Sequence, residues 1–200
     1  MTVKRIVVTG GPCGGKSTAL AYIKKTAEAL GFRVLTVGET ATELISGGVA
    51  PWTCATNAVY QNFQIALQMH KEEIFLAAAA TMGAEKLLIV CDRGLLDNRA
   101  YMTEAEFFSC LASRGDTLEE YLARYDAVFH LVTAAKGAEA FYTTANNAAR
   151  TETPDEARRV DDRLICAWAE HPRRFVLDNS GDFADKMARL ATALEEVLTE

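Results

Sequence analysis

The feature that most constrains this chain is a glycine-rich stretch near its start, Thr9–Thr18, which reads TGGPCGGKST. A short β-branched run, Arg5–Thr9, precedes it and predicts a buried strand. A helix-forming stretch that ends at Gly31 follows it. The stretch matches the spacing G-x-x-x-x-G-K-[ST] at Gly10, Gly15, Lys16 and Ser17. A strand, a glycine turn of this kind and a helix together predict a P-loop, which binds phosphate groups.

The residue types in this loop suit a nucleoside triphosphate. Glycines let the backbone approach phosphate oxygens without a Cβ in the way, and successive N–H groups at a helix N-terminus form a cradle for anions. We expect Lys16 to contact the β- and γ-phosphates and the Ser17 hydroxyl to bind Mg²⁺. The predicted nucleotide-binding residues are Gly10, Gly11, Pro12, Cys13, Gly14, Gly15, Lys16, Ser17 and Thr18. The expected cofactors are therefore ATP or GTP, with Mg²⁺.

Composition limits the other classes of function. The chain has 200 residues, of which 50% are hydrophobic, and this is enough for one domain with a sizeable core. A net charge of −6 without a Lys/Arg run argues against sequence-independent binding of nucleic acid. No stretch approaches the length of a membrane span. Five cysteines with no CxxC spacing predict reduced thiols. We expect a soluble cytoplasmic protein.

Cys13 lies inside the loop and leaves two interpretations open. One is a redox-sensitive thiol, because a helix N-terminus lowers the pKa of a thiol. The other, which we favour, is that position 13 varies freely and that cysteine is tolerated there.

Strands and helices alternate along the chain, which predicts a parallel sheet with right-handed crossovers. The predicted strands are Arg5–Thr9, Arg33–Val37, Lys86–Cys91, Ala127–Val132 and Arg174–Leu177. The predicted helices are Ser17–Leu30, Glu39–Ile45, Thr56–Thr81, one opened by the capping box Thr103–Glu106, one from Thr153 to about Glu170, and Phe183–Leu198. The expected fold is a single α/β P-loop NTPase domain over residues 1–200, with a five-stranded parallel sheet flanked by helices. Ligands in such a sheet bind beyond the carboxyl ends of the strands.

The longest predicted helix carries an apolar stripe that we expect to face the core. Its members are Val59, Phe63, Ala66, Leu67, His70 and Ile74.

Three charged residues follow two of the predicted strands. Asp92 comes directly after an apolar strand, where a carboxylate can hold Mg²⁺ beside a P-loop. Arg93 is next, and its guanidinium can bind phosphate oxygens; the alternative is a structural arginine. Glu39 follows the second strand and can accept a proton from an attacking hydroxyl or orient a water. The alternative for Glu39 is a carboxylate that interacts with a helix dipole.

The segment between the fourth and fifth strands begins polar and turn-rich and then becomes rich in arginine. In a phosphoryl-transfer enzyme a mobile helical lid, here residues 136–163, carries arginines over the triphosphate. Arg150 and Arg158 are our choices for that role. The alternative is a solvated helix with surface ion pairs, each of which contributes little to stability.

A set of motifs stands in a recognisable order along the chain. They are GGPCGGKST, GETATELISGG, CDRGLLDNRAYM, RYDAVFHL, NNAARTE, W-x-x-HP and LDNSGDFADK. From about Arg5 to Lys186, this set resembles a small P-loop ATPase and kinase family with an AAA-type ATP-binding domain. The family is related to the ribosylnicotinamide kinase domain of NAD-regulator proteins and to the TRPL translocation-defect proteins.

The resemblance implies a core like that of nucleoside and nucleotide kinases, with ATP or GTP and Mg²⁺. More distantly, Glu39 and the Asp92–Arg93 pair resemble the acidic residue after strand two and the acidic-arginine pair after strand three of deoxynucleoside kinases. There the first residue acts on the acceptor hydroxyl and the arginine contacts phosphates, and the resemblance implies the same roles here.

The sequence favours a kinase that transfers the γ-phosphoryl group of ATP or GTP to a small hydroxylated metabolite such as a nucleoside. The expected catalytic residues are Lys16, Glu39, Asp92, Arg93, Arg150 and Arg158, and the expected metal ligands are Ser17 and Asp92. We expect the acceptor near Trp52, Tyr60, Gln61 and Gln64. The alternative function is a nucleotide-dependent switch or adaptor with slow NTPase activity and a protein or lipid partner. No motif decides between adenine and guanine or fixes the oligomeric state.

Overall fold

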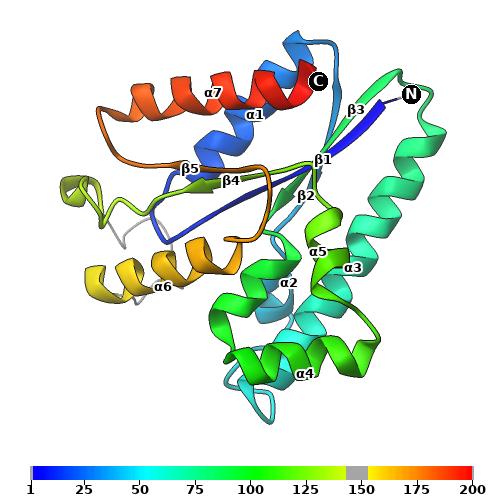
Figure 1. Ribbon diagram of the computed structural model, residues 1–200, viewed down its shortest axis with the longest axis vertical. Helices are drawn as coiled ribbons and strands as arrows, with labels where there is room; N and C mark the ends of the chain where they lie inside the picture. The colour runs from blue at the N-terminus through cyan, green and yellow to red at the C-terminus, as the bar shows by residue number, and fades with distance from the viewer. Residues whose placement is uncertain (1, 143–152, 200) are drawn as a thin grey trace.

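A parallel sheet forms the centre of the computed structural model, which describes residues 2–142 and 153–199. Its strands within those residues are β1 (Thr2–Gly10), β2 (Arg33–Val37), β3 (Lys86–Asp92), β4 (Ala127–Leu131) and β5 (Arg174–Leu177). They lie in the order β2-β3-β1-β4-β5, and all neighbours are parallel (Figure 1). The predicted five-stranded parallel sheet is confirmed.

The helices follow the predicted alternation closely. They are α1 (Lys16–Ala29), α2 (Thr40–Ser46), α3 (Asn57–Thr81), α4 (Glu104–Arg114), α5 (Leu118–Ala123), α6 (Pro154–Ala167) and α7 (Phe183–Thr199), with 3₁₀ helices η1 (Leu95–Tyr101) and η2 (Glu139–Phe141). The capping box predicted at Thr103 is formed, and a second capping box at Thr153 opens α6. Sequence reasoning missed α5, although Thr117 and Glu120 form a capping box at its start.

Helices cover both faces of the sheet (Figure 1). On one face α1 and α7 pack against a core that includes Ile6 and Val8. On the other, η1, α3 and α6 surround a core that includes Val7 and Trp168. This alternation along β1 is what a strand buried on both faces requires. The pairing of Val8 with Asp92 brings the ends of β1 and β3 to the same edge of the sheet.

The apolar stripe predicted for α3 does not face the core, and that prediction was wrong. Val59, Phe63 and Ile74 are 39%, 51% and 51% exposed, and Ala66 and His70 are exposed as well. The buried face of α3 is instead largely polar. Its buried residues are Tyr60, Gln61, Gln64, Ile65, Gln68, Glu72 and Ala79. Hydrogen bonds and a cavity, described below, account for this burial, because polar groups enter an interior only when they find partners.

No helix in the described part of the chain is both long and apolar enough to cross a membrane.

Candidate active site

A cavity of about 470 Å³ lies where the P-loop, the segment after β2 and the end of β3 meet. It is lined by Pro12, Cys13, Gly14, Lys16, Ser17, Glu39, Ala41, Thr42, Ile45, Pro51, Trp52, Asn57, Tyr60, Gln61, Gln64, Asp92, Arg93, Tyr101 and Val160. Lys16, Ser17, Glu39, Asp92 and Arg93 therefore share one cavity, although they come from three separate segments of the chain. The carboxyl-end location is the one expected for ligands of a parallel sheet.

At two positions of the glycine-rich loop, the backbone conformation accommodates only glycine. Gly10 has φ 142°, and a Cβ there would lie 2.1 Å from the carbonyl oxygen of Leu131. Gly15 has φ 90° and is the N-cap of α1. Gly15 has no side chain that could cap the helix. The first turn of α1 also contains no acidic residue. The N–H groups of that turn are left for an anion, as a phosphate cradle requires.

Lys16 projects into the cavity without a carboxylate partner among the described residues. Its ammonium donates a hydrogen bond to the carbonyl of Gly10 at 3.4 Å. Burial, and then the charge of Arg93, lower the pKa of Lys16 to about 8. A desolvated cation without an anion partner is unfavourable until an anion arrives. The site around Lys16 therefore fits a phosphate group.

Glu39 and Arg93 form an ion pair in the cavity, with Nε and Oε1 2.5 Å apart. The second oxygen of Glu39 accepts a hydrogen bond from Thr42 at 2.7 Å. Burial raises the pKa of Glu39, but Arg93 and Thr42 together bring it down to about 2. Glu39 is the N-cap of α2, yet its carboxylate makes no capping hydrogen bond. These contacts favour a role in the cavity over the alternative role at the helix end.

Asp92 has a buried carboxylate oxygen, Oδ1, that finds no hydrogen-bond partner among residues 2–142 and 153–199. Burial raises the pKa of Asp92 above its ordinary value, although the charge of Lys16 opposes this shift. A carboxylate oxygen left without a donor, beside the hydroxyl of Ser17 in the same cavity, fits a hard divalent cation. Asp92 and Ser17 are therefore the residues that could hold Mg²⁺.

The cavity wall built from α3 and the segment before it carries no charged side chain. Two polar atoms in this wall have no hydrogen-bond partner in the described part of the chain, the hydroxyl of Tyr60 and Oε1 of Gln61. Their residues are only 2% and 3% exposed. The amide nitrogen of Gln61 donates to Asn57 at 3.2 Å, so its oxygen remains to accept a hydrogen bond. Gln64 lines the same wall, and Trp52, largely exposed, lies at the cavity as well. The structure thus places all four predicted acceptor residues in the cavity.

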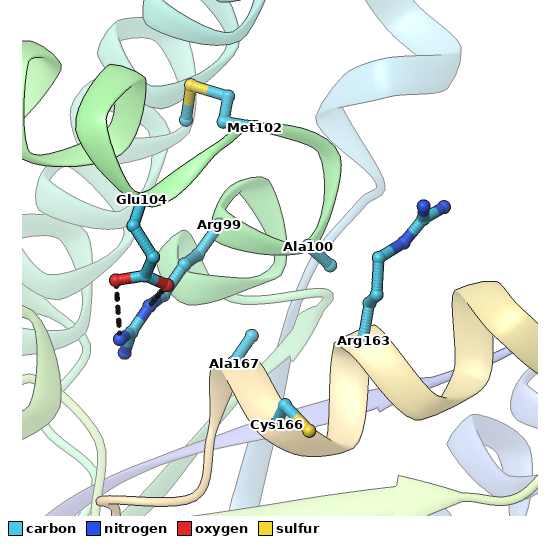
Figure 2. Close-up of a pocket in the computed structure, with 7 residues that line it drawn as sticks. All are labelled: Arg99, Ala100, Met102, Glu104, Arg163, Cys166 and Ala167. Carbon is cyan, nitrogen blue, oxygen red and sulfur yellow. Dashed lines mark hydrogen bonds and ion pairs between the residues drawn. The ribbon is translucent and has the colours of Figure 1, made fainter.

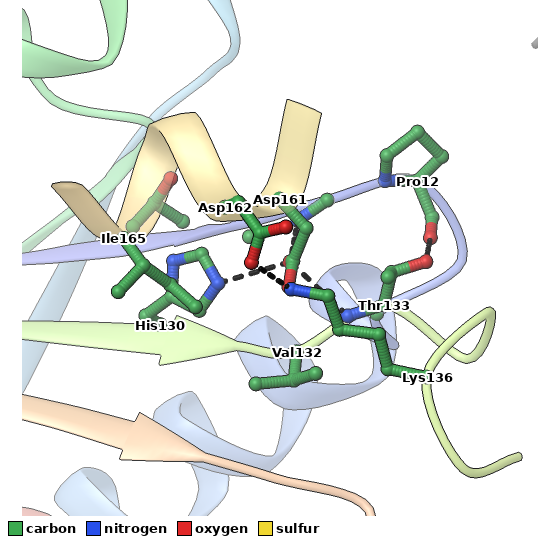
Figure 3. A network of polar contacts seen from close by, with 12 residues as sticks. Pro12, His130, Val132, Thr133, Lys136, Asp161, Asp162 and Ile165 are labelled. Atoms are coloured by element: carbon green, nitrogen blue, oxygen red, sulfur yellow. Dashed lines mark hydrogen bonds and ion pairs between the residues drawn. The ribbon is translucent and has the colours of Figure 1, made fainter. Parts of the chain in front are cut away.

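Asp161, on α6, was not predicted as part of the site, yet it contacts the P-loop directly (Figure 3). Its fully buried carboxylate accepts hydrogen bonds from the amides of Gly11 at 2.9 Å and Thr133 at 3.2 Å, from His130 Nε2 at 3.0 Å and from Lys136 at 2.8 Å. Thr133 in turn donates to the carbonyl of Pro12 at 2.5 Å. These contacts fasten α6 and the segment after β4 to the first half of the loop.

Lys186 holds the other half of the loop and was also missed as a site residue. Its buried ammonium donates to the carbonyl of Gly14 at 3.2 Å, to the carbonyl of Val132 at 2.8 Å and to Asn179 at 2.9 Å. Burial lowers the pKa of Lys186 to about 8. The loop is therefore positioned from both sides by buried charged groups.

Residues 5–186 match the family model of an AAA domain. This chain belongs to that family. No curated protein matches its sequence. Deoxyadenosine kinase from M. mycoides, solved with bound dATP, is similar in structure, with a TM-score of 0.60 over 96% of this chain and 99% of that chain at 14% sequence identity. At that identity the likeness concerns the fold, and the AAA domain has the fold of P-loop nucleoside kinases.

Of the two arginines predicted for the lid of this AAA domain, the structure describes only Arg158. Arg150 lies outside the described residues. Arg158 donates to the carbonyl of Ala135 at 2.5 Å and pairs with Asp155 at 2.8 Å, and it does not line the cavity. Among the α6 residues described, Val160 is the one that lines it.

A second, smaller cavity of about 260 Å³ lies between α6 and η1 (Figure 2). Arg99 and Arg163 line it, but Arg99 is already paired with Glu104 and with Glu170, both at 2.9 Å. Of the predicted site residues that the structure describes, none lines this cavity.

We expect replacement of Asp161 by Asn to change the acid sensitivity of the AAA domain. Burial raises the pKa of Asp161, but His130, Lys136 and Gly11 together bring it down to about 2, from 3.8 when unfolded. A carboxylate with a depressed pKa stabilises the fold above its unfolded pKa, and that stabilisation is lost as the pH falls through the folded value. The wild type should therefore lose about 2 kcal/mol more stability than Asp161→Asn between pH 5 and pH 2.

Urea unfolding at several pH values measures this difference. Asp162→Asn is the matched control, because Asp162 also pairs with Lys136 but is exposed. Equal pH dependence in the wild type and Asp161→Asn would contradict the prediction.

Proposed function

We propose that this protein transfers the γ-phosphoryl group of ATP or GTP to a hydroxyl of a small metabolite without an anionic group, such as a nucleoside. The observation that carries the proposal is the shared cavity. Within the residues that the structure describes, this cavity combines Lys16, which has no carboxylate partner, and an unpartnered Asp92 oxygen with two buried polar groups, on Tyr60 and Gln61, that lack hydrogen-bond partners. The first pair suits a metal-bound triphosphate and the second suits a polar organic acceptor.

Each charged or metal-binding residue of the cavity has a role in this transfer. The first-turn amides of α1 and Lys16 hold phosphates, and Ser17 with Asp92 would hold Mg²⁺, which neutralises developing charge when bound. Glu39 orients the acceptor hydroxyl toward the γ-phosphorus and takes its proton as the new O–P bond forms, while the bond to the nucleoside diphosphate breaks and the diphosphate leaves. Arg93, beside it, offers its remaining N–H groups to the phosphate oxygens.

The lid of residues 136–163, with Arg150 and Arg158 over the triphosphate, is also part of the proposal. Arg158 would have to exchange its contacts with Ala135 and Asp155 for phosphate oxygens. Its ion pair with the exposed Asp155 contributes little to stability, so the exchange costs little.

The neutral wall around Tyr60 and Gln61 favours an acceptor without a phosphate or carboxylate of its own. An enzyme that phosphorylates a nucleotide must compensate the acceptor's phosphate with cations, and this wall offers none. We also propose the closer relation to ribosylnicotinamide kinases, so ribosylnicotinamide belongs among the candidate acceptors.

We expect phosphoryl transfer to one or more nucleosides or to ribosylnicotinamide, and none to the matching 5′-monophosphates. The measurement is ATP- or GTP-dependent formation of a phosphorylated product, resolved by mass spectrometry across a paired panel. Transfer only to monophosphates would contradict the proposal that the acceptor carries no anionic group. If no acceptor is phosphorylated while a partner binds the triphosphate and diphosphate states differently, the protein is a switch rather than a kinase.

A further inference from the structure

The buried polar face of α3 extends beyond the cavity and reaches the turn that carries Arg93. Gln61 and Gln64 line the cavity, but Gln68 and Glu72, further along the same face, do not. We infer that Gln68, oriented by Glu72, is a positioning residue that holds Arg93 in place against Glu39. This inference deepens the proposed function and rests on it only where activity is measured.

The turn at Arg93 has an unfavourable backbone conformation that contacts with neighbouring residues must stabilise. Arg93 has φ 70°, the left-handed region, where a residue with a Cβ is unfavourable. Such a conformation costs roughly 1–3 kcal/mol and persists where the surrounding structure over-determines it. The neighbouring contacts of the turn must therefore supply that support.

Gln68 supplies it from the α3 side. Its amide nitrogen donates to the carbonyl oxygen of Arg93 at 3.0 Å and to Glu72 Oε1 at 3.1 Å. An amide nitrogen has two hydrogens, and these two contacts use both. The side chain is 3% exposed, so neither bond competes with bulk water.

Glu72 fixes the orientation of that amide. Its side chain is fully buried, and Oε2 pairs with Arg5 at 3.1 Å and with Arg124 at 3.4 Å. Oε1 accepts a further hydrogen bond from Tyr125 at 2.8 Å. A carboxylate held in this way offers Gln68 only acceptor atoms, so the amide must present its nitrogen and not its oxygen.

The opposite side of the turn is held independently. The amide of Arg93 donates to Val8 at 3.0 Å, and the amide of Gly94 donates to Asp97 at 2.6 Å. With its amide and its carbonyl both bonded, Arg93 directs its guanidinium to Glu39 at 2.5 Å and to the carbonyl of Gly10 at 3.4 Å. Removal of the Gln68 bond should release the carbonyl and let the turn relax, which moves the guanidinium away from Glu39.

The first test needs no substrate. Gln68→Met keeps the length of the side chain and removes both donors. Hydrogen exchange at Arg93 Nε, followed by ¹⁵N NMR, reports the bond to Glu39 directly, with Arg93→Lys to assign the signal. We expect a protected signal in the wild type and exchange at least ten-fold faster in Gln68→Met.

The matched control is His171→Phe. His171 is buried in the segment between α6 and β5 and hydrogen-bonds to the Tyr125 carbonyl at 3.0 Å, so this variant also loses an internal hydrogen bond. It should keep the wild-type protection at Arg93. If Gln68→Met does not fold, Gln68→Asn is used, because its shorter side chain cannot span both partners. Unchanged protection in the folded Gln68 variant would overturn the inference.

The second test uses catalysis, with ATP hydrolysis as the readout if no acceptor is found. Misplacement of a catalytic group by about 1 Å can cost up to roughly 10²-fold in rate. We therefore expect kcat to fall by roughly ten- to a hundred-fold in the Gln68 variant, with the KM for ATP changed less than three-fold, and no change in His171→Phe. Faster exchange at Arg93 with an unchanged kcat would show that Gln68 positions Arg93 while the role proposed for Arg93 fails. An unchanged exchange rate overturns the positioning role itself.

Discussion

Replacement of Glu39 by Gln should lower the rate of phosphoryl transfer by roughly 10²- to 10⁴-fold, the range for loss of a group that handles the reacting proton. The variant keeps the shape of the side chain but loses its charge. It can no longer hold Arg93 by an ion pair at 2.5 Å, and it accepts a hydrogen bond from the acceptor hydroxyl more weakly. Single-turnover transfer to the acceptor identified in the paired panel is the measurement.

The affinity of Glu39→Gln for nucleotide should be retained or increased, although its transfer rate falls. Glu39 places a negative charge in a cavity that receives a polyanion, so its neutralisation leaves Arg93 and Lys16 free to attract phosphates. We expect calorimetry to give an affinity for Mg-ATP that is equal to that of the wild type or a few-fold tighter. A rate loss with retained affinity is the signature of an interaction used in the transition state.

Glu43→Gln is the control for this experiment. Glu43 lies on the same helix, α2, and also forms an ion pair, with Lys71, but it is exposed and does not line the cavity. Its variant should transfer phosphate at the wild-type rate. Equal rates in Glu39→Gln and the wild type would instead leave Glu39 with only a structural role at the start of α2.

The central strands β3 and β4 could be predicted from the sequence because they are buried on both faces, and the shorter edge strands because polar or glycine turns flank them. Arg33–Val37 and Arg174–Leu177 have the predicted bounds, and β3 extends the predicted Lys86–Cys91 by one residue. Continuous apolar runs between glycine or polar turns have few other solutions in a chain of this size. The order of the elements then fixed the sheet edge at which the P-loop, Glu39 and Asp92 meet.

The orientation of α3 could not be predicted in the same way. Periodicity identified the helix but selected the wrong face, because the stripe with Phe63 and Ile74 is more apolar than the one with Gln64 and Gln68. Hydropathy measures transfer from water and not the hydrogen bonds a side chain will find after folding. The partners of Gln68 include the carbonyl of Arg93, and no local pattern in the sequence reports that contact.

Asp161 and Lys186 were missed for a related reason, although a weak signal exists for each. Their contacts with the P-loop join residues 150 and 172 positions apart, which no motif encodes. Asp161 nevertheless shares a helical stripe with the buried Ala157 and Leu164, and Lys186 shares one with the buried Leu190. A charged residue in the middle of an apolar stripe predicts a buried partner, and this spacing is the cue that could have identified both.

Replacement of Lys16 by Met should weaken nucleotide binding and strengthen the ligand-free fold at the same time. Hydrogen bonds to charged groups contribute about 1.5–3 kcal/mol. Loss of the ammonium should therefore reduce the affinity for Mg-ATP by roughly 10- to 100-fold, as measured by calorimetric titration. The methionine retains the methylenes of the side chain, so a change in packing does not explain the loss.

The gain in stability follows from the depressed pKa of Lys16. Its pKa is about 8 in the folded protein and 10.5 when unfolded, so at pH 7 the native state bears the cost of a buried, unpaired cation. That cost is present below pH 8 and disappears as the pH rises to 10.5, because the unfolded chain then binds more protons than the native state. At pH 7 the variant should be more stable than the wild type by about 1–3 kcal/mol, and the difference should vanish above pH 10.5.

Lys24→Met is the control, because Lys24 lies on the same helix, is exposed and has only a weak pair with Glu28 at 3.9 Å. It should change neither affinity nor stability by a measurable amount. If Lys16→Met lost stability as well as affinity, the ammonium would have a structural role in the loop. Lower nucleotide affinity together with higher stability of the ligand-free fold would mean that the protein maintains an unfavourable charge at Lys16. A bound polyphosphate is the partner that compensates this charge.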